Sequence, residues 1–376
     1  MRFLSADYLF TLTSEPLKNG VLQVNNTGEI INIFNTRSGS FSDKIEIYSG
    51  ILCPGFINSH CHLELSHLKG ISNNVKGFSE FLSIVNQRDS FSKSKILDAI
   101  KNAEEEMLQN GIVAIGDVCN TTDTLIQKKS RNLLYYNFIE TFEVSDVEAD
   151  NVIEKSLNIR DVFRSNDMKA TITPHALYSV PPYLMSRILK ISDDKDILFS
   201  IHNQETNNEN KLFLNKEGDL CDWLKSIKAS PEIWHKRDAS NSFFKEFKTK
   251  KDILLVHNTY TSKQEITDNY YCTCPKANLF IEQKIPDYSI FNIDRLCVGT
   301  DSLASNDSLS IMSELSIIQK NSDFTLQELL KIACKNGAKA LGFKDFGTFE
   351  IGKKPGVNLI SNFELGLEKS DLKKII

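Results

Sequence analysis

Short runs of apolar residues recur after residue 50, and this recurrence limits the fold more than any other feature of the sequence. Each run is apolar on successive residues, which is typical of parallel strands that are buried on both faces. Stretches with apolar residues at helical spacing separate the runs. Eight buried strands alternating with helices predict an α/β fold, a (β/α)8 TIM barrel. The runs are ILCPGFIN from residue 51, GIVAIGDV from 111, LLYYNFIE from 133, KATITPH from 169, ILFSIHNQE from 197, DILLVHNT from 252, YYCTCP from 270 and LCVGTDS from 296.

Two of the separating stretches carry helix signals at their ends. Residues 96–110 place four apolar side chains on one helix face, and Gly111 follows where a C-cap glycine is common. The stretch from Thr325 to Gly342 begins with a capping box, in which Thr325 is followed three residues later by Glu328. The four apolar residues of the first stretch are Ile96, Ile100, Ala103 and Met107.

The two ends of the chain have a different character. The segment GVLQVNNTGEIINIF predicts a β-hairpin, and DFGTFEIGKKPGVNLIS near the carboxyl end has similar turns and strands. We expect residues 1–52 and 345–376 to form one small β-sandwich domain beside a barrel of residues 53–344. The stretch 206–250 is long for a barrel loop. We expect it to hold helices of its own, in LCDWLKSI and NSFFKEF, and leave open whether it covers the site.

Polar side chains gather at the ends of the predicted strands. Five of the seven histidines lie at or just beyond such an end, and an aspartate ends the eighth run. In a barrel of this kind every strand ends at one face, where catalytic residues lie. These six side chains are therefore expected to meet. They are His60, His62, His175, His202, His257 and Asp301.

Two short motifs point to metal-assisted hydrolysis. His60 and His62 are two residues apart, so on an extended chain both imidazoles face the same side and can bind one ion. His202 is followed by Glu205. A metal ion lowers the pKa of water toward ~7, and a nearby carboxylate can carry the proton. Alone, each motif is equally typical of a packed histidine pair or of a surface carboxylate.

The motifs PGFINSHCH, TPHALYSV, IHNQE, LVHNT and GTDS, in this order, resemble the amidohydrolase superfamily. Within it they are similar to the aminohydrolase branch, above all to aminodeoxyfutalosine deaminases and adenosylhomocysteine/methylthioadenosine deaminases. The resemblance covers nearly the whole chain. It is specific for the superfamily and less specific for the substrate.

The resemblance implies a ligand set for one divalent metal ion. Relatives with two ions have a bridging lysine near the end of the fourth strand, whereas Lys169 lies at the start of that strand here. Three imidazoles and one carboxylate suit zinc, with iron and manganese as alternatives. The implied ligands are His60, His62, His202 and Asp301.

The resemblance also implies catalytic roles. Glu205 matches the glutamate that carries a proton from water to the leaving group. His257 matches the histidine that polarises the reacting carbon and stabilises negative charge, and Asp301 also orients the water. His175 matches a residue that contacts substrate. The implied reaction is hydrolytic deamination of an aminopurine nucleoside.

Three further residues are candidates for substrate binding. Glu64 matches a loop position that is acidic in nucleoside deaminases, where it binds ribose hydroxyls. Arg88 could meet a substrate carboxylate, because a guanidinium pairs with one through two bonds. Asn278 matches a position in the seventh-strand turn that lines the pocket.

Composition excludes several classes of partner. The net charge is −5 and the lysines are scattered, so we expect no nucleic-acid partner. No stretch approaches the ~18 apolar residues of a membrane helix, and the first residues do not resemble a secretory signal. The eight cysteines are spread along the chain, which is typical of reduced thiols in a cytoplasmic protein. A small-molecule substrate is expected, and both a monomer and a homodimer stay open.

Two other functions remain in view. One is a cyclic amidase or a triazine-type amino- or chlorohydrolase. Ring amidases often use two metal ions, so the absence of the bridging lysine disfavours the cyclic amidase. The other is an inactive barrel that acts as a binding protein. The presence of all four ligands and Glu205 argues against it.

Overall fold

The computed structural model of the chain describes residues 1–38, 41, 44–71, 78–144, 148–191, 198–230 and 252–376. Two four-stranded sheets form its larger part, in the orders β11-β10-β9-β8 and β12-β13-β14-β15. Every neighbouring pair in both sheets is parallel. All eight predicted strands are therefore present, with the predicted direction. They are β8 Phe56–Cys61, β9 Ile112–Cys119, β10 Leu134–Thr141, β11 Lys169–Pro174, β12 Leu198–Asn203, β13 Asp252–His257, β14 Tyr270–Thr273 and β15 Leu296–Val298.

The edges of the two sheets touch at both sides. Isolated parallel bridges join Cys61 to Asp301 and Ala176 to His202. Beside the first bridge, a Cβ on Gly299 would lie only 2.7 Å from the carbonyl oxygen of His60. Glycine is needed here because the backbones of β8 and β15 approach so closely. These contacts bring the carboxyl ends of the strands to one face.

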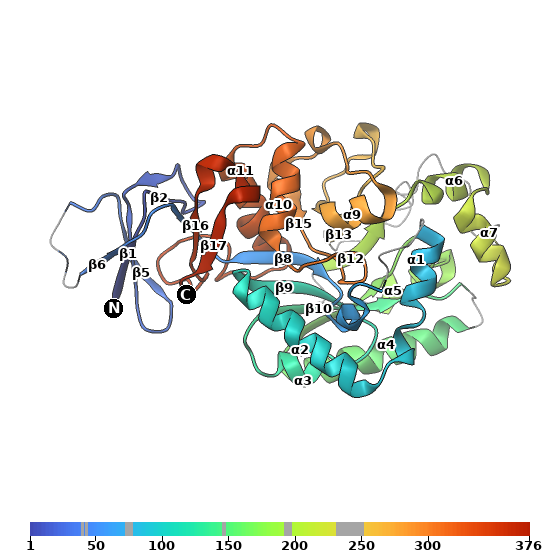
Figure 1. The fold of residues 1–376 in the computed structure, drawn as a ribbon. Helices are drawn as coiled ribbons and strands as arrows, with labels where there is room; N and C mark the ends of the chain where they lie inside the picture. Colours follow the sequence, from blue (N-terminus) through green and yellow to red (C-terminus); the bar gives the residue numbers. More distant parts are fainter. Residues whose placement is uncertain (39–40, 42–43, 72–77, 145–147, 192–197, 231–251) are drawn as a thin grey trace.

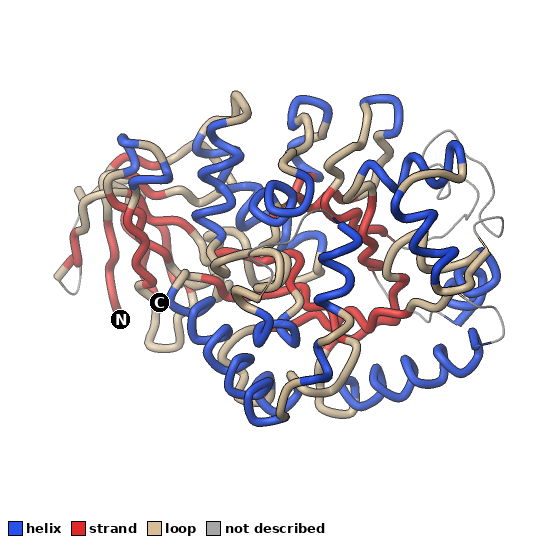
Figure 2. The backbone as a smooth tube through the Cα atoms, turned by 45° about the vertical axis from the view of Figure 1, so that its right-hand side comes forward, coloured by secondary structure: helices blue, strands red, loops and turns tan. Residues whose placement is uncertain are grey.

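Helices cover the outer faces of the sheets, whose strands lie in the interior in Figure 2. The helix predicted from the spacing of Ile96 to Met107 is α2, and Gly111 follows it with φ of +69°. The predicted capping box of Thr325 and Glu328 is present at the start of α11. The helices are α1 Phe78–Val85, α2 Lys93–Gln109, α3 Leu125–Lys128, α4 Ala149–Arg164, α5 Pro182–Ile191, α6 Asn207–Asn215, α7 Asp219–Ser226, α9 Pro275–Glu282, α10 Ile311–Lys320, α11 Leu326–Leu330 and α12 Gly337–Ala340.

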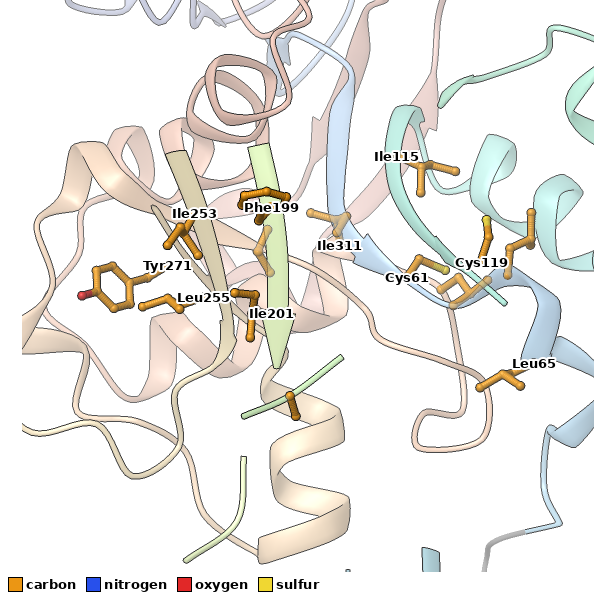
Figure 3. Close-up of a cluster of buried hydrophobic side chains, with 14 of the residues drawn as sticks. Cys61, Leu65, Ile115, Cys119, Phe199, Ile201, Ile253, Leu255, Tyr271 and Ile311 are labelled. Carbon is orange, nitrogen blue, oxygen red and sulfur yellow. The ribbon is translucent and has the colours of Figure 1, made fainter. Parts of the chain in front are cut away.

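The strands read as continuously apolar because their two faces enter two different clusters. In β13, Ile253 and Leu255 pack with one cluster of buried side chains, and Leu254 and Val256 pack with another. Figure 3 shows part of the first cluster, where Ile253 lies beside Phe199 and Leu255 lies beside Ile201 of β12. All eight cysteines are buried and free of disulfides, as expected from their spread.

The two ends of the chain lie together at one side of the molecule (Figure 1). The predicted hairpin is present as β4 and β5, which pair antiparallel. The C-terminal strand β16 pairs antiparallel with β7, which leads directly into β8. The two sheets at this end have the orders β5-β4-β1-β6 and β17-β16-β7-β2-β3. Their strands are β1 Arg2–Ser5, β2 Tyr8–Leu9, β3 Leu17–Lys18, β4 Val21–Val24, β5 Ile30–Phe34, β6 Ile45–Ile47, β7 Ile51–Cys53, β16 Asn358–Ser361 and β17 Asp371–Lys374.

The long stretch after β12 contains helices, as its sequence predicts. Helices α6 and α7 occupy its first part, and α7 contains the LCDWLKS segment. The second predicted helix, in NSFFKEF, lies outside the described residues. Within the described part of the chain, none of the helices has the length and apolar character needed to cross a membrane.

Candidate active site

Three imidazole nitrogens converge at the carboxyl ends of the strands. The Nε2 atom of His62 lies 3.2 Å from Nε2 of His60 and 3.2 Å from Nε2 of His202. The Oδ1 atom of Asp301 lies 3.5 Å from Nε2 of both His60 and His62. Four ligands at ~2.1 Å around a tetrahedral ion are roughly 3.4 Å from one another. The spacing of these four residues is compatible with one tetrahedral metal ion. His257 also brings a ring nitrogen within 4.8 Å of ligand atoms of His60, His202 and Asp301. The predicted ligand set stays a prediction.

Hydrogen bonds outside this cluster hold two of its members in a ligating orientation. The Nδ1 atom of His202 lies 2.9 Å from the carbonyl oxygen of His175 and donates to it, so Nε2 keeps its lone pair. Asp301 accepts a short hydrogen bond from the Ser305 hydroxyl through Oδ2, which leaves Oδ1 facing the histidines. Both contacts are typical of partners that orient metal ligands.

Burial and the neighbouring groups favour the protonation states in which these side chains bind metal. Burial lowers the pKa of His60 and His62, so both rings are neutral at neutral pH. Burial acts to raise the pKa of Asp301, but the hydrogen bond to His60 and the charges of His62 and His257 outweigh it. The pKa of Asp301 therefore falls below its ordinary value. Neutral imidazoles and an ionised carboxylate are the forms that ligate metals.

Glu205 and His257 form a second pair beside the ligands. The Oε1 atom of Glu205 lies 3.6 Å from Nε2 of His257. The Nδ1 atom of His257 donates to Oδ1 of Asn278 at 2.8 Å, which leaves a lone pair on Nε2. That Nε2 atom has no hydrogen-bond partner among the described residues. Burial raises the pKa of Glu205 to about 8 and lowers the pKa of His257, so a proton donor lies beside a proton acceptor.

The backbone is strained where the strands end. Gln204, His257 and Asp301 have φ values of +47°, +72° and +56°, in the left-handed region. Residues other than glycine adopt it at a cost of about 1–3 kcal/mol, and such residues cluster at functional sites. The strain therefore lies beside the ligands and the proton-carrying pair.

A cavity of about 270 Å³ opens onto these groups. Of the predicted site residues, His62, His175, His202, Glu205, His257, Asp301 and Arg88 line it, and His60 lies behind them. Apolar and aromatic side chains from the loop after β8, from α1 and α7, and from the segments after β10 and β11 form much of its wall. They are Leu65, Phe78, Phe81, Leu82, Val85, Phe142, Tyr178 and Trp223. A larger cavity of about 530 Å³ lies at the opposite ends of the strands, and no predicted site residue lines it.

Two of the predicted substrate contacts lie outside the cavity lining. Glu64 accepts from the backbone of Asn120 at 3.0 Å and from the backbone and hydroxyl of Thr121 at 3.1 and 3.0 Å. Burial raises the pKa of Glu64 to about 7. Asn278 is fully buried, and its contact with His257 orients that ring. Both residues lie one layer behind the surface that a substrate would touch.

Arg88 lines the cavity, and its guanidinium is engaged with the protein. Its Nη1 atom donates to Oδ1 of Asn120 at 2.7 Å and lies 3.8 Å from Glu64. Lys169 is the first residue of β11, at the end of the strand away from the ligands. Its amino group donates to the carbonyl oxygens of Leu341 and Gly342 at 3.3 and 2.8 Å.

Six polar residues of the cavity lining were not predicted from the sequence, namely Asn86, Asn120, Glu140, Tyr178, Ser179 and Ser302. Glu140 lies near the end of β10, and the preference for polar residues at strand ends could have identified it. Asn120 follows β9 directly. Tyr178 carries a buried hydroxyl without a hydrogen-bond partner among the described residues, and no local signal in the sequence identifies it.

Comparison with known proteins gives consistent results. The sequence profile of the amidohydrolase family matches residues 51–374. The chain is 26% identical over 325 residues to an adenosine deaminase of Helicobacter pylori, covering 83% of this chain and 79% of that protein. It is 24% identical over 326 residues to an aminodeoxyfutalosine deaminase of a Nitratiruptor species, with the same coverage.

A solved structure is similar over the whole length. It is the aminofutalosine deaminase of Helicobacter pylori in complex with methylthio-coformycin. The TM-score is 0.82 at 22% identity, and the alignment covers 100% of both chains. This likeness shows a common fold.

Proposed function

The chain belongs to the amidohydrolase family, and we propose that this metal-dependent hydrolase removes ammonia from a 6-aminopurine nucleoside. The convergence of His60, His62, His202 and Asp301 beside Glu205 in one cavity carries the proposal. The similar proteins named above are deaminases of such nucleosides, which supports this choice of substrate.

The four converging residues would hold the metal ion, and zinc is the ion that we propose. When bound, such an ion supplies a water molecule whose pKa is lowered toward ~7. The lone pair on Nε2 of His257 would accept a hydrogen bond from that water and help Asp301 to orient it toward the purine carbon. This role differs from the charge-stabilising one that the resemblance implies for His257. Glu205 takes a proton from the water and delivers it to the departing nitrogen. The water oxygen would form the new bond to carbon, one water proton would reach the amino group through Glu205, and the other would end on the neighbouring ring nitrogen. The C–N bond then breaks, so ammonia and a 6-oxopurine nucleoside are the products.

The cavity wall supports an aromatic substrate. Its long apolar face, with Phe78, Phe81 and Trp223, suits a flat ring and an apolar group on the sugar. A cyclic amide or a triazine would also fit such a wall. The position of Lys169, far from the ligands, favours one ion and so disfavours ring amidases of the two-ion type.

We also propose that the two parallel sheets close into one (β/α)8 barrel spanning residues 53–344. The bridges from Cys61 to Asp301 and from Ala176 to His202 support closure at both edges. Residues 1–52 and 345–376 would form the small β-sandwich domain, supported by the pairing of β7 with β16. A homodimer stays a prediction.

The test is ammonia release by the zinc-loaded protein. The substrates are 6-amino-6-deoxyfutalosine, 5′-deoxyadenosine, adenosine and adenosylhomocysteine, with a triazine and a cyclic amide as controls. We expect release from at least one nucleoside and about one bound zinc per chain. Turnover of a control compound alone, or two tightly bound ions, would contradict the proposal.

A further inference from the structure

Glu140 is a buried carboxylate in the cavity wall with acceptor capacity to spare. Its Oε1 atom has no hydrogen-bond partner among the described residues. The same atom lies 3.6 Å from Nδ1 of His202 and 4.0 Å from Nε2 of His175. A carboxylate has about four acceptor positions, and a buried one left open indicates a missing partner.

A chain of hydrogen bonds fixes how Glu140 is oriented. Arg88 donates to Oδ1 of Asn120 at 2.7 Å, which turns the amide nitrogen of Asn120 toward Glu140. That nitrogen donates to Oε2 of Glu140 at 3.0 Å. Arg88 therefore acts on the cavity through Asn120. The carboxylate is held in place by one oxygen, and the other remains open.

His175 presents a second acceptor next to this one. The hydroxyl of Ser179 donates to the carbonyl oxygen of Ala176 at 3.2 Å. Its oxygen can then accept from Nδ1 of His175, which lies 2.6 Å away, so Nδ1 carries the ring hydrogen and Nε2 keeps a lone pair. Two acceptors therefore lie side by side in the same wall. Such a pair matches a substrate that presents two neighbouring donors, as the vicinal hydroxyls of a ribose do.

A second metal ion does not explain the open oxygen. Such an ion would lie between His62, Glu140 and His202, whose ligand atoms are close enough. However, Nε2 of His202 faces the first cluster, and Nδ1 of His202 donates to the carbonyl oxygen of His175. Since no lone pair of His202 is left, the open oxygen points to an organic ligand.

We propose that Glu140 selects ribonucleosides by accepting a hydrogen bond from the sugar 2′-hydroxyl. Nε2 of His175 accepts from the neighbouring 3′-hydroxyl through its lone pair. The inference rests on the proposed function. It moves the sugar contact from Glu64 to Glu140, because Glu64 already accepts three hydrogen bonds and lies outside the cavity lining.

The test compares adenosine with 2′-deoxyadenosine as substrates and as competitive inhibitors of the best nucleoside substrate. It uses zinc-loaded wild type, Glu140→Ala, Glu140→Gln and Glu64→Gln, with metal content measured for each. A site built around a hydroxyl rejects the analogue that lacks it, so we expect wild type to prefer adenosine by about 100-fold or more. Glu140→Ala should bring the preference below ~10-fold with zinc retained. Glu140→Gln should lie between, and Glu64→Gln should keep the wild-type ratio.

The outcomes separate this inference from the function on which it rests. If wild type neither binds nor deaminates any nucleoside, the proposed function fails and this inference fails with it. If nucleosides are deaminated but Glu140→Ala keeps the wild-type preference, only the role of Glu140 is wrong. Loss of zinc from Glu140→Ala would make the residue a metal ligand and overturn the inference. A changed ratio in Glu64→Gln alone would return the sugar contact to Glu64.

Discussion

Two buried polar clusters lie close together near the ends of β8, β9 and β10, and they differ in how their hydrogen bonds are used. In the first, the amino group of Lys128 contacts Asp117, Asn137 and Cys119. The other oxygen of Asp117 accepts from the backbone of Leu63 at 2.8 Å. The charges and hydrogen bonds of this cluster are matched within the protein.

The second cluster is the active site, and it contains open polar atoms. Of the ten buried side-chain atoms without partners among the described residues, four lie here: Nδ1 of His60, Nε2 of His257, Oε1 of Glu140 and the hydroxyl of Tyr178. Buried polar groups are normally paired, because an unpaired one costs free energy. We infer that a cluster whose polar atoms are all paired within the protein (a closed cluster) stabilises the fold. A cluster with unpaired polar atoms beside a cavity (an open cluster) is arranged for a ligand.

The closed cluster also supports the open one. Leu63, whose backbone Asp117 holds, directly follows the ligand His62. The Lys128–Asp117 pair therefore fixes the start of the loop that carries a metal ligand. If the distinction is correct, substitutions in the closed cluster should cost stability, and substitutions in the open cluster should cost activity.

Glu205→Gln should give the largest effect, and the effect should be on activity alone. An amide cannot carry the proton, and general acid–base catalysis contributes roughly 10²–10⁴-fold. We expect kcat to fall about 1000-fold or more, with bound zinc and the midpoint of thermal unfolding unchanged. Steady-state ammonia release, metal analysis and calorimetry measure the three quantities. A variant with near-normal turnover would falsify the role of Glu205.

Lys128→Met should give the next largest effect, on stability. It leaves the buried carboxylate of Asp117 without its cation, and breaking a buried ion pair in this way costs about 3–5 kcal/mol. The double variant Lys128→Met/Asp117→Asn should recover part of the loss, because no buried charge is left unpaired. Urea unfolding of wild type and both variants gives the free energies. A loss of unfolding free energy below about 1 kcal/mol in the single variant would mean that Lys128 does not balance the charge of Asp117 in the folded protein.

The sequence was sufficient to predict which side chains converge at the strand ends, but not which hydrogen bonds the groups around them make. His60, His62, His202 and Asp301 could be predicted because position at a strand end and residue type together determine where they lie. Glu140 follows the same pattern. It was passed over because a single glutamate at the end of a strand is unremarkable until its partners are known.

Glu64 and Asn278 lie near the cavity but outside its lining, and their roles as substrate contacts stay predictions. Whether a carboxylate or amide faces a ligand depends on which hydrogen bonds it already makes. The partners of Glu64 at Asn120 and Thr121 are about sixty residues away in the sequence. The aromatic wall was not predicted for a similar reason. Phe81 and Trp223 come from separate helices that meet only in the folded chain.

The pH dependence of stability tests Glu314, a buried carboxyl group whose hydrogen bonds are made within the protein. Glu314 is fully buried and accepts from the backbone of Lys276 at 2.9 Å and from Asn306 at 2.8 Å. Burial raises its pKa from 4.5 to about 8. The folded chain therefore holds a proton that the unfolded chain releases above pH 4.5. This contribution is complete below pH 4.5 and is lost as the pH rises to about 8.

Glu314→Gln should remove this dependence, since glutamine resembles the protonated side chain. Between pH 5 and pH 9, wild type should lose a few kcal/mol of unfolding free energy more than the variant does. Urea unfolding of both proteins at the two pH values measures the difference. Parallel losses in the two proteins would show that Glu314 keeps its proton, or stays ionised, throughout.

Two buried tyrosines, one with a paired hydroxyl and one with an unpaired hydroxyl, should give the smallest changes in stability and allow a direct comparison. The hydroxyl of Tyr135 donates to Oε1 of Glu104 at 2.6 Å, whereas the hydroxyl of Tyr178 has no partner among the described residues. Tyr135→Phe should cost about 1–2 kcal/mol, because it removes a hydrogen bond to a carboxylate. Tyr178→Phe should change stability by less than about 0.5 kcal/mol, because no bond is lost in the free protein.

The same pair should behave oppositely in catalysis. Tyr178 lines the cavity and its hydroxyl is open to a substrate, so its loss should raise KM for the nucleoside by severalfold. Tyr135 lies outside the cavity lining, and its loss should act on stability rather than on KM. If Tyr178→Phe destabilises the protein as much as Tyr135→Phe does, the hydroxyl is already paired in solution. The hydroxyl of Tyr178 would then not be held open for a ligand.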